Sequence, residues 1–495
     1  MPSPYDTYTS PLATRNASEQ MLRLWSPRHK FNTWRRIWLA VAEAQHELGL
    51  PVTKEQVEEL RAVVNRPGGI TDAEMAAAEK YESELRHDVM AHVHALGDSC
   101  PKAKGIIHLG MTSQDVVCNA DATVLDDANE LIAWKLLRTI SSFADKARLH
   151  VRMPALAFTH YQPAQPTTVG RRNALWGHDL WLCFHRLTDS GFGYRVQPRG
   201  LKGATGTQAS FLSLLGECGT DVDKLESDFL DRFSPSDMAS LRLTGQTYPR
   251  VIDTFILADL ASTASVLHKI ATDIRLLCNR KEIDEPFEDK QIGSSAMPYK
   301  RNPMRCERIC GLTRFVMNLV GNAYDTAATQ WLERTLDDSS NRRLSLPEAF
   351  LALDGALDLM HNVASGLIVH EAMVRKNLMA ELPFMATENI LMACVKAGGD
   401  RQHYHEVIRQ HAQAAGLRVK QEGLDNDLLE RLKADKAFHA PALKHELNWE
   451  GLMDPMQYVG RSVEQTERFI KEVVEPLRQQ YGEAITKLES SGPKV

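Results

Sequence analysis

The middle of this 495-residue chain carries apolar stripes that are longer than ordinary globular helices. One stripe spans residues 252–277, where apolar side chains recur at intervals of three or four residues or of their sum. The members are Ile252, Ile256, Leu260, Leu267, Ile270, Ile274 and Leu277. This spacing places them on one face of a helix. Similar stripes at residues 132–147 and 309–320 therefore predict a bundle of long helices packed at shallow angles.

The remaining pattern predicts an all-α fold of three domains. Strand signals are few, and 495 residues exceed what a single core fills. The sequence pattern changes twice: a stretch rich in Gly, Ser, Pro and Lys ends near residue 112, and shorter, more charged helices begin after residue 369. We therefore predict an N-terminal helical domain at 1–112, a central long-helix bundle at 113–369 and a C-terminal helical domain at 370–495. Broad apolar faces on such long helices also suit assembly of several subunits.

Composition excludes some classes of protein. A formal net charge of −6 argues against a nucleic-acid binder, which would carry a basic bias. The N-terminus has neither the basic nor the apolar segment of a secretory signal, and no run of about 18 apolar residues predicts a membrane span. The eight cysteines are scattered, and only Cys306 and Cys310 lie close together, without a second pair. Buried thiols in a reducing, cytoplasmic compartment are favoured over a zinc site.

Residues 293–303 read Gly-Ser-Ser-Ala-Met-Pro-Tyr-Lys-Arg-Asn-Pro. Asn302 suits a helix N-cap and Pro303 the first helical position, so the segment is expected to be a loop entering a helix. Backbone N–H groups and two cations would then surround Ser294 and Ser295 and favour an ionised serine. A solvated basic loop with an ordinary cap is the alternative.

Two histidine segments could supply an acid. His160 stands in Phe-Thr-His-Tyr-Gln-Pro-Ala-Gln-Pro, where the two prolines predict an irregular, rigid segment; an imidazole held there could deliver a proton or be purely structural. His87 lies in Arg-His-Asp, with His92 and His94 nearby. The group lacks the His-x-x-x-His spacing of a metal site, so it is either a polar helix face or a donor to an anionic substrate.

Other segments could bind anions. Thr112-Ser113-Gln114-Asp115 fits a capping box, and the N-terminus of the helix that it opens could hold an anion. Residues 334–343 carry three arginines among acidic and hydroxyl residues, which could grip a phosphate and a carboxylate or form an internally paired turn. Gln246 is an unremarkable loop amide by itself.

The loop at 293–303 resembles the Gly-Ser-x-x-Met-x-x-Lys-x-Asn signature of the fumarase/aspartase superfamily, through Gly293, Ser294, Met297, Lys300 and Asn302. Its Tyr-Lys-Arg-Asn-Pro ending is similar to that of the adenylosuccinate lyase family. The histidine, Thr-Ser and arginine segments follow in that family's order, from about residue 10 to residue 480.

The resemblance implies three helical domains, a twenty-helix core in a homotetramer, and active sites drawn from three chains. It also implies β-elimination of fumarate from adenylosuccinate, giving AMP, and from the succinyl-carboxamide intermediate of purine synthesis (SAICAR), giving AICAR. The implied partners are these succinyl-purine nucleotides, with no metal or organic cofactor, nucleic acid or membrane. A sister lyase, such as one acting on argininosuccinate, and a non-catalytic structural homologue remain as alternatives.

The resemblance also implies roles for individual residues. Ser294 would be the base, with Ser295 as the fallback, and His160 the acid. His87 would support binding or the proton path, and Lys300 would favour the serine alkoxide and bind carboxylate. The positions matched to substrate binding are Arg15, Asn16, Arg86, His87, Asp88, Thr112, Ser113, Thr159, Gln246, Ser295, Asn302, Arg308, Arg334, Ser339 and Arg343. Asn16 departs from the tyrosine that often follows the arginine in the family.

Overall fold

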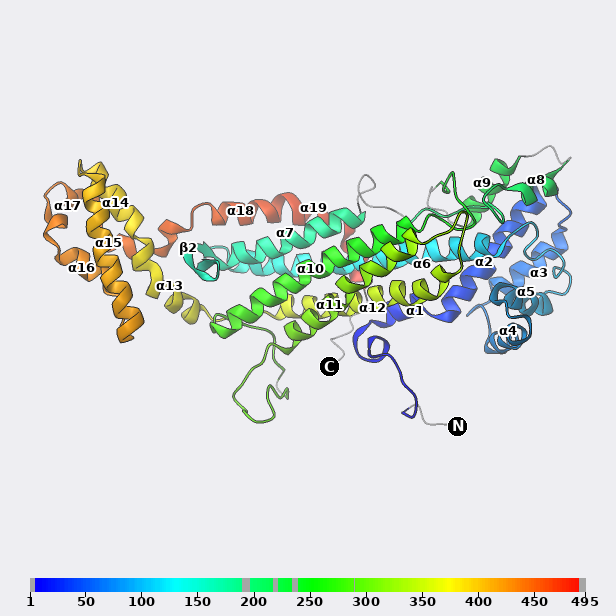
Figure 1. The fold of residues 1–495 in the computed structure, drawn as a ribbon, viewed down its shortest axis with the longest axis horizontal. Coiled ribbons are helices and arrows are strands. Elements are labelled where there is room, and N and C mark those ends of the chain that lie inside the picture. The colour runs from blue at the N-terminus through cyan, green and yellow to red at the C-terminus, as the bar shows by residue number, and fades with distance from the viewer. Residues whose placement is uncertain (1–4, 189–195, 217–220, 234–238, 289, 489–495) are drawn as a thin grey trace.

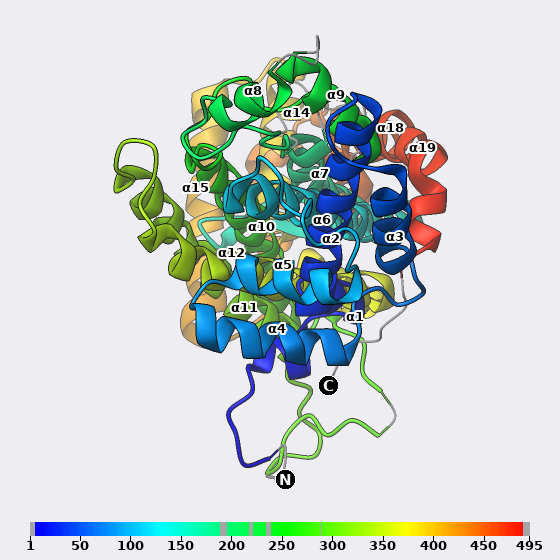
Figure 2. The same ribbon diagram turned by 90° about the vertical axis from the view of Figure 1, so that its right-hand side faces the viewer.

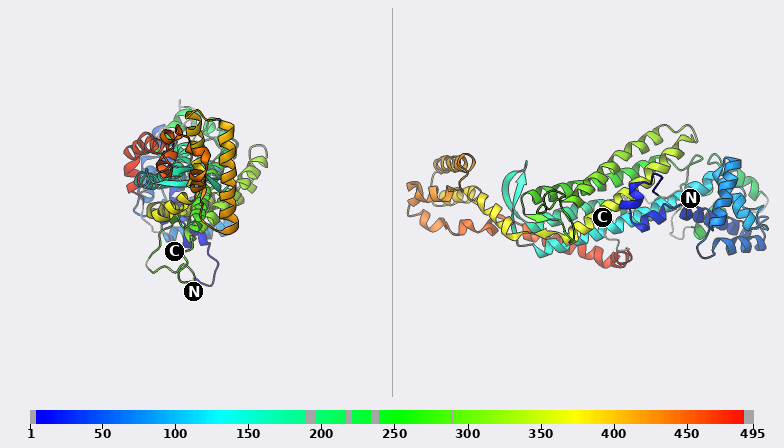
Figure 3. Two further views of the ribbon diagram at one scale, coloured as in Figure 1. Left: turned by 90° about the vertical axis from the view of Figure 1, so that its left-hand side faces the viewer. Right: turned by 90° about the horizontal axis from the view of Figure 1, so that it is seen from below.

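The computed structural model describes residues 5–188, 196–216, 221–233, 239–288 and 290–488, and these form an elongated, mainly helical molecule (Figure 1). Short N-terminal helices lie at one end of a long bundle and C-terminal helices at the other (Figure 3). The all-α prediction is confirmed, since the strands among these residues form only two small antiparallel pairs.

The elements fall into groups along this axis. At the N-terminal end lie α1 (Glu19–Leu24), α2 (Pro27–Glu47), α3 (Lys54–Val64), α4 (Asp72–Leu85), α5 (Asp88–Ser99), α8 (Ala209–Leu215) and α9 (Val222–Phe233), as Figure 2 shows. The bundle consists of α6 (Ser113–Leu149), α7 (Val169–Thr188), α10 (Val251–Asn279), α11 (Met304–Ala328) and α12 (Asp337–Gly366). The far end holds α13 (Glu371–Met385), α14 (Thr387–Lys396), α15 (Arg401–Leu417), α16 (Leu428–Ala434) and α17 (Leu443–Glu446). The last helices, α18 (Ser462–Phe469) and α19 (Glu475–Thr486), return along α7 and α6.

The three predicted stripes are helical faces of α10, α6 and α11. Every stripe residue between 252 and 277, and those at Ile132, Leu136, Ile140, Phe143 and Ala147, are buried in the largest apolar cluster. The stripe of α11 is only partly covered, because Phe315 remains 38% exposed. Periodicity therefore predicted the bundle correctly, and α11 keeps an apolar surface that this chain does not cover.

The segment that contains Pro163 and Pro166 is a strand, so the prediction of an irregular segment was wrong. Strand β1 (Pro154–Thr159) pairs antiparallel with β2 (Gln162–Thr168), and the register shifts between Leu156 and Phe158. In a two-stranded sheet each strand has an unpaired edge, where a residue without an N–H is tolerated. The prolines therefore fit a hairpin, with a local irregularity in its ladder.

The two predicted helix starts had different outcomes. Thr112 is the N-cap of α6, and its backbone N–H donates to Asp115 Oδ2 at 2.8 Å, so the capping box is confirmed. Asn302 is not an N-cap, because α11 begins at Met304 after Pro303. The Asn302 amide instead donates to the Gly293 carbonyl, 2.8 Å away. A tertiary contact has replaced the expected local one.

The predicted domain limits coincide with element ends, since α6 begins at Ser113 and strand β4 (Ile368–Val369) ends at Val369. Its partner strand, β3 (Ile283–Asp284), lies between α10 and α11. Separate apolar clusters lie at each end, although the N-terminal one also takes residues from α8 and α9. The division into three domains stays a prediction.

In the described part of the chain, two helical stretches have the length and mean hydropathy of a membrane span, namely α10 and residues Glu371–Lys396. In α10, 56% of the relevant window is buried in the bundle, as in a core helix. A core helix passes the same test, so these stretches are weak evidence for a membrane.

Candidate active site

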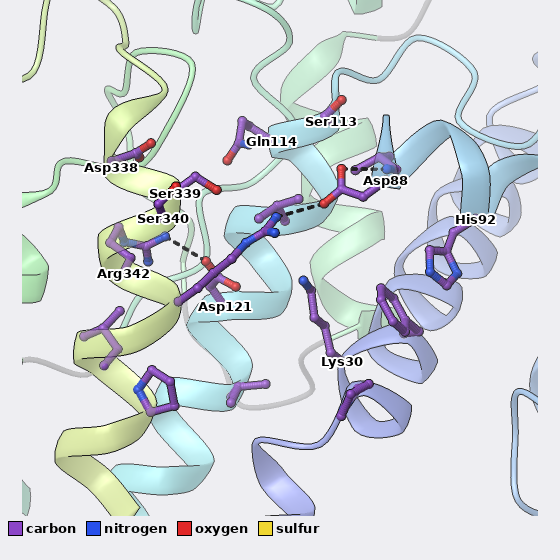
Figure 4. A pocket seen from close by; sticks show the side chains of 18 of the residues that line it. Lys30, Asp88, His92, Ser113, Gln114, Asp121, Asp338, Ser339, Ser340 and Arg342 are labelled. Atoms are coloured by element: carbon purple, nitrogen blue, oxygen red, sulfur yellow. Dashed lines mark hydrogen bonds and ion pairs between the residues drawn. The ribbon is translucent and has the colours of Figure 1, made fainter. Parts of the chain in front are cut away.

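A cavity of about 840 Å³ lies where α2, α5, α6 and α12 meet (Figure 4). Seven of the predicted site residues line it: Arg86, His87, Asp88, Ser113, Arg334, Ser339 and Arg343. They come from segments far apart in the sequence, which fold together around the cavity (Figure 4). Sequence reasoning missed Lys30 and Asp121, which line the same cavity without belonging to any motif.

His87 joins α5 to the start of α6. It is the N-cap of α5, and its Nδ1 accepts a hydrogen bond from the Met90 backbone N–H at 3.3 Å. Nδ1 is therefore unprotonated in the neutral ring, which leaves the hydrogen on Nε2. Nε2 lies 3.4 Å from Ser113 Oγ. The geometry thus presents an N–H donor beside the first turn of α6, as a site for an anionic group requires.

Two arginines that line the cavity make contacts beyond it: Arg334 binds Gln246, and Arg343 connects α12 to α5. Arg334 Nη1 donates to Gln246 Oε1 at 3.0 Å, and Arg343 Nη2 donates to Asp88 Oδ2 at 2.9 Å. A Cβ on Gly245 would lie 2.6 Å from the Glu333 carbonyl oxygen, so the two loops need glycine there to approach each other. The arginine segment therefore lines the cavity, where Arg334 also pairs with Asp338 of the same segment, and its role in substrate binding stays a prediction.

The start of α6 is fixed by a buried carboxylate. Asp115 is fully buried and accepts from the backbone N–H groups of Thr112, Lys202 and Gly203 at 2.8, 2.9 and 3.0 Å. It also forms an ion pair with the buried Arg199, whose guanidinium donates to the Gly245 carbonyl at 2.9 Å. A carboxylate with this many partners is held in one geometry, and it holds Ser113 and the Gln246 loop with it.

His160 lies at the tip of the β1–β2 hairpin. Thr159 pairs with Gln162, so His160 and Tyr161 form the two-residue turn, with φ values of 53° and 57°. Positive φ at both central residues is what a type I′ turn requires, although glycine or asparagine is more usual there. Strained residues of this kind concentrate at functional sites. The turn leaves the imidazole exposed, as a group that serves a neighbouring surface would be.

The signature loop at residues 293–303 precedes α11, and Gly293 at its start lies against Lys300 and Asn302 near its end. A Cβ on Gly293 would clash with the Lys300 carbonyl oxygen, and the Asn302 amide donates to the Gly293 carbonyl. Ser294 Oγ accepts from the backbone N–H groups of Ala296 and Met297 at 3.4 and 3.2 Å. These donors favour an oxyanion at Ser294. The side chains of Ser295 and Lys300 are exposed.

Arg15 and Arg308 form a third group, beside the middle of α12. Burial and the neighbouring charge of Arg15 lower the pKa of Arg308. The Asn16 carbonyl packs directly on α12, where a Cβ on Gly355 would lie 2.6 Å away. The Asn16 amide donates to the Pro11 carbonyl at 2.9 Å, so its donor is already used within the N-terminal segment.

The predicted residues thus fall into three groups, and two of these groups lie at opposite ends of the bundle. Helix α6 starts at the cavity and ends just before the hairpin, and its 37 residues span about 55 Å. Helix α12 likewise starts at the cavity and ends at Gly366, which packs on Pro286 at the base of the signature loop. His87, Ser113 and Arg343 therefore cannot meet His160 within one chain.

Comparison with known proteins identifies the family. Residues 14–318 match the family described as Lyase, and residues 383–469 match Adenylosuccinate lyase C-terminus. The adenylosuccinate lyase of Saccharomyces cerevisiae is 47% identical over 474 residues, which cover 95% of each chain. The chain belongs to the adenylosuccinate lyase family. The adenylosuccinate lyases of Schizosaccharomyces pombe and Schistosoma mansoni are 48% and 44% identical, over 95% and 97% of this chain and 95% and 98% of theirs.

Solved structures support the fold of this adenylosuccinate lyase family member. A fumarate lyase from Mesorhizobium sp. BNC1 superposes with a TM-score of 0.76 at 22% identity, covering 94% of this chain and 99% of its own. A 3-carboxy-cis,cis-muconate lactonizing enzyme from Pseudomonas putida also gives 0.76, at 23% identity, covering 93% and 98%. At such identities the likeness shows the fold alone.

Proposed function

We propose that this lyase cleaves adenylosuccinate to AMP and fumarate, and SAICAR to AICAR and fumarate. The observation that carries the proposal is the 47% identity to a yeast adenylosuccinate lyase over 95% of both chains. The cavity supports it, since it gathers arginines, hydroxyls and a histidine suited to a phosphate and carboxylates.

The proposed reaction is a β-elimination. The Ser294 alkoxide removes a proton from the succinyl methylene, and the carbanion that forms delocalises into the adjacent carboxylate. The carbon–nitrogen bond then breaks with its electron pair going to nitrogen, and protonated His160 donates a proton to that nitrogen. Two backbone N–H groups at Ser294 Oγ support the alkoxide, because preorganised donors stabilise charge without reorganisation.

We further propose a homotetramer in which each active site combines several chains. The cavity residues of one chain would meet the hairpin and the signature loop of neighbours, since α6 alone holds Ser113 and His160 about 55 Å apart. The partly exposed apolar face of α11, with Phe315 38% exposed, offers surface for that assembly. Cytoplasmic location remains a prediction from the sequence.

A spectrophotometric assay tests the proposed function. Purified protein given adenylosuccinate should remove the absorbance of the succinylated purine and release AMP and fumarate in equal amounts. Activity on argininosuccinate without activity on adenylosuccinate would favour a sister lyase. Lack of turnover with every succinyl compound would favour a non-catalytic homologue.

A further inference from the structure

Lys30 of α2 is a cation inside the cavity with no acidic partner of its own. Its side chain is half-buried, and Nζ lies 5.3 Å from the centre of the Phe31 ring and 4.9 Å from that of Trp34. Within the described part of the chain the ammonium makes no ion pair or hydrogen bond, although the backbone N–H of Lys30 donates to the Ser26 carbonyl. In Figure 4 it points from α2 into the cavity, toward the space between Asp88 and Asp121.

Two of the carboxylates near Lys30, Asp88 and Asp121, are already engaged by arginines of α12, and Glu82 of α4 acts on Lys30 more weakly than either of them. Asp88 accepts from Arg343 at 2.9 Å, and Asp121 accepts from Arg342 at 3.1 Å. Burial is the main cause that lowers the pKa of Lys30, and Arg343 adds to it, while the carboxylates oppose it. The Phe31 and Trp34 rings stabilise the ammonium without neutralising it, so a ligand that supplies negative charge would stabilise it further.

We propose that Lys30 is a further substrate-binding residue, which binds the phosphate of the nucleotide together with Arg343 from the facing wall. The inference rests on the proposed function and extends it, since the sequence motifs did not mark Lys30. A phosphate monoester carries a charge of roughly −1.5 to −2 at neutral pH, so it can satisfy two cations from opposite walls. A lysine ammonium binds phosphate as a compact point charge with three donors.

The phosphate is preferred over a succinyl carboxylate because of where Lys30 lies. The N–H donors beside Ser113 and His87 are at the start of α6, and Figure 4 shows Ser113 and Lys30 on different sides of Asp88. Lys30 instead shares the cavity with Ser339 and Arg343 of the first turns of α12, and the charge of Arg343 acts on it.

Calorimetric affinities for AMP and adenosine, measured on the assembled protein, test this inference. Lys30→Met should weaken AMP binding roughly ten- to a hundredfold and leave adenosine binding nearly unchanged, since a charged hydrogen bond is lost. Lys30→Arg, which keeps the charge, should retain most of the AMP preference. Lys54→Met is a matched control, because Lys54 is 79% exposed on α3.

Equal losses for AMP and adenosine, or an unchanged affinity ratio, would overturn the phosphate assignment. Lys30→Gln repeats the measurement if the methionine variant does not assemble. The test separates the two proposals, because wild-type cleavage of adenylosuccinate decides the function, whereas the AMP-to-adenosine ratio decides Lys30.

Discussion

Ser294→Ala should lower kcat for adenylosuccinate cleavage by about 10²–10⁴-fold, the usual contribution of a positioned acid or base. Ser294 is the hydroxyl of the signature loop whose oxygen accepts two backbone N–H groups, from Ala296 and Met297. The substitution removes only a half-buried oxygen from a loop whose two ends are joined by the hydrogen bond from Asn302 to Gly293. Thermal unfolding and the assembly state should therefore match the wild type, as checked by circular dichroism and size-exclusion chromatography.

Ser295→Ala is the matched control for this prediction. Its side chain is exposed, and it is the neighbouring hydroxyl of the same loop. We expect it to keep most of the wild-type rate. If Ser295→Ala were inactive and Ser294→Ala kept its activity, Ser295 would be the base in place of Ser294.

His160→Asn should lower kcat for adenylosuccinate cleavage by a similar factor, about 10²–10⁴-fold, because it removes the proposed acid that protonates the leaving nitrogen. Asparagine is chosen because it tolerates positive φ, and His160 has a φ of 53° in the hairpin turn. The hairpin should thus keep its shape while losing the imidazole. Steady-state kinetics with adenylosuccinate measure the effect.

His405→Ala controls for the loss of a histidine, since His405 is exposed on α15 at the far end of the molecule. It should have nearly wild-type kinetics. Near-normal turnover by His160→Asn would remove His160 from the role of acid and leave it a structural turn residue.

The sequence predicted the features that depend on local spacing. The long helices follow from stripes such as Ile252–Leu277, and the start of α6 follows from Thr112 and Asp115, three residues apart. Each of these patterns is complete within a few turns of chain. Interactions between residues close in the chain determine these helices, so a single sequence is enough to predict them.

Features that depend on tertiary contacts could not be predicted in this way. Asn302 does not cap α11, because its side-chain amide donates to the Gly293 carbonyl. The segment that contains Pro163 and Pro166 is a strand, because β1 pairs with it. Lys30 belongs to no motif, and its place in the cavity depends on packing between α2, α6 and α12. The separation of the two ends of the site follows only from the length of the folded helices.

We expect one chain to supply the cavity of each active site and another chain to supply its His160. Co-expression of two inactive variants, His160→Asn and the double variant Arg334→Met/Arg343→Met, shows whether the sites are shared in this way. If each site combines chains, mixed oligomers should recover roughly a quarter of the wild-type activity, because one site in four then receives both intact parts. Activity no higher than the sum of the two parent variants, in oligomers shown to contain both chains, would contradict shared sites.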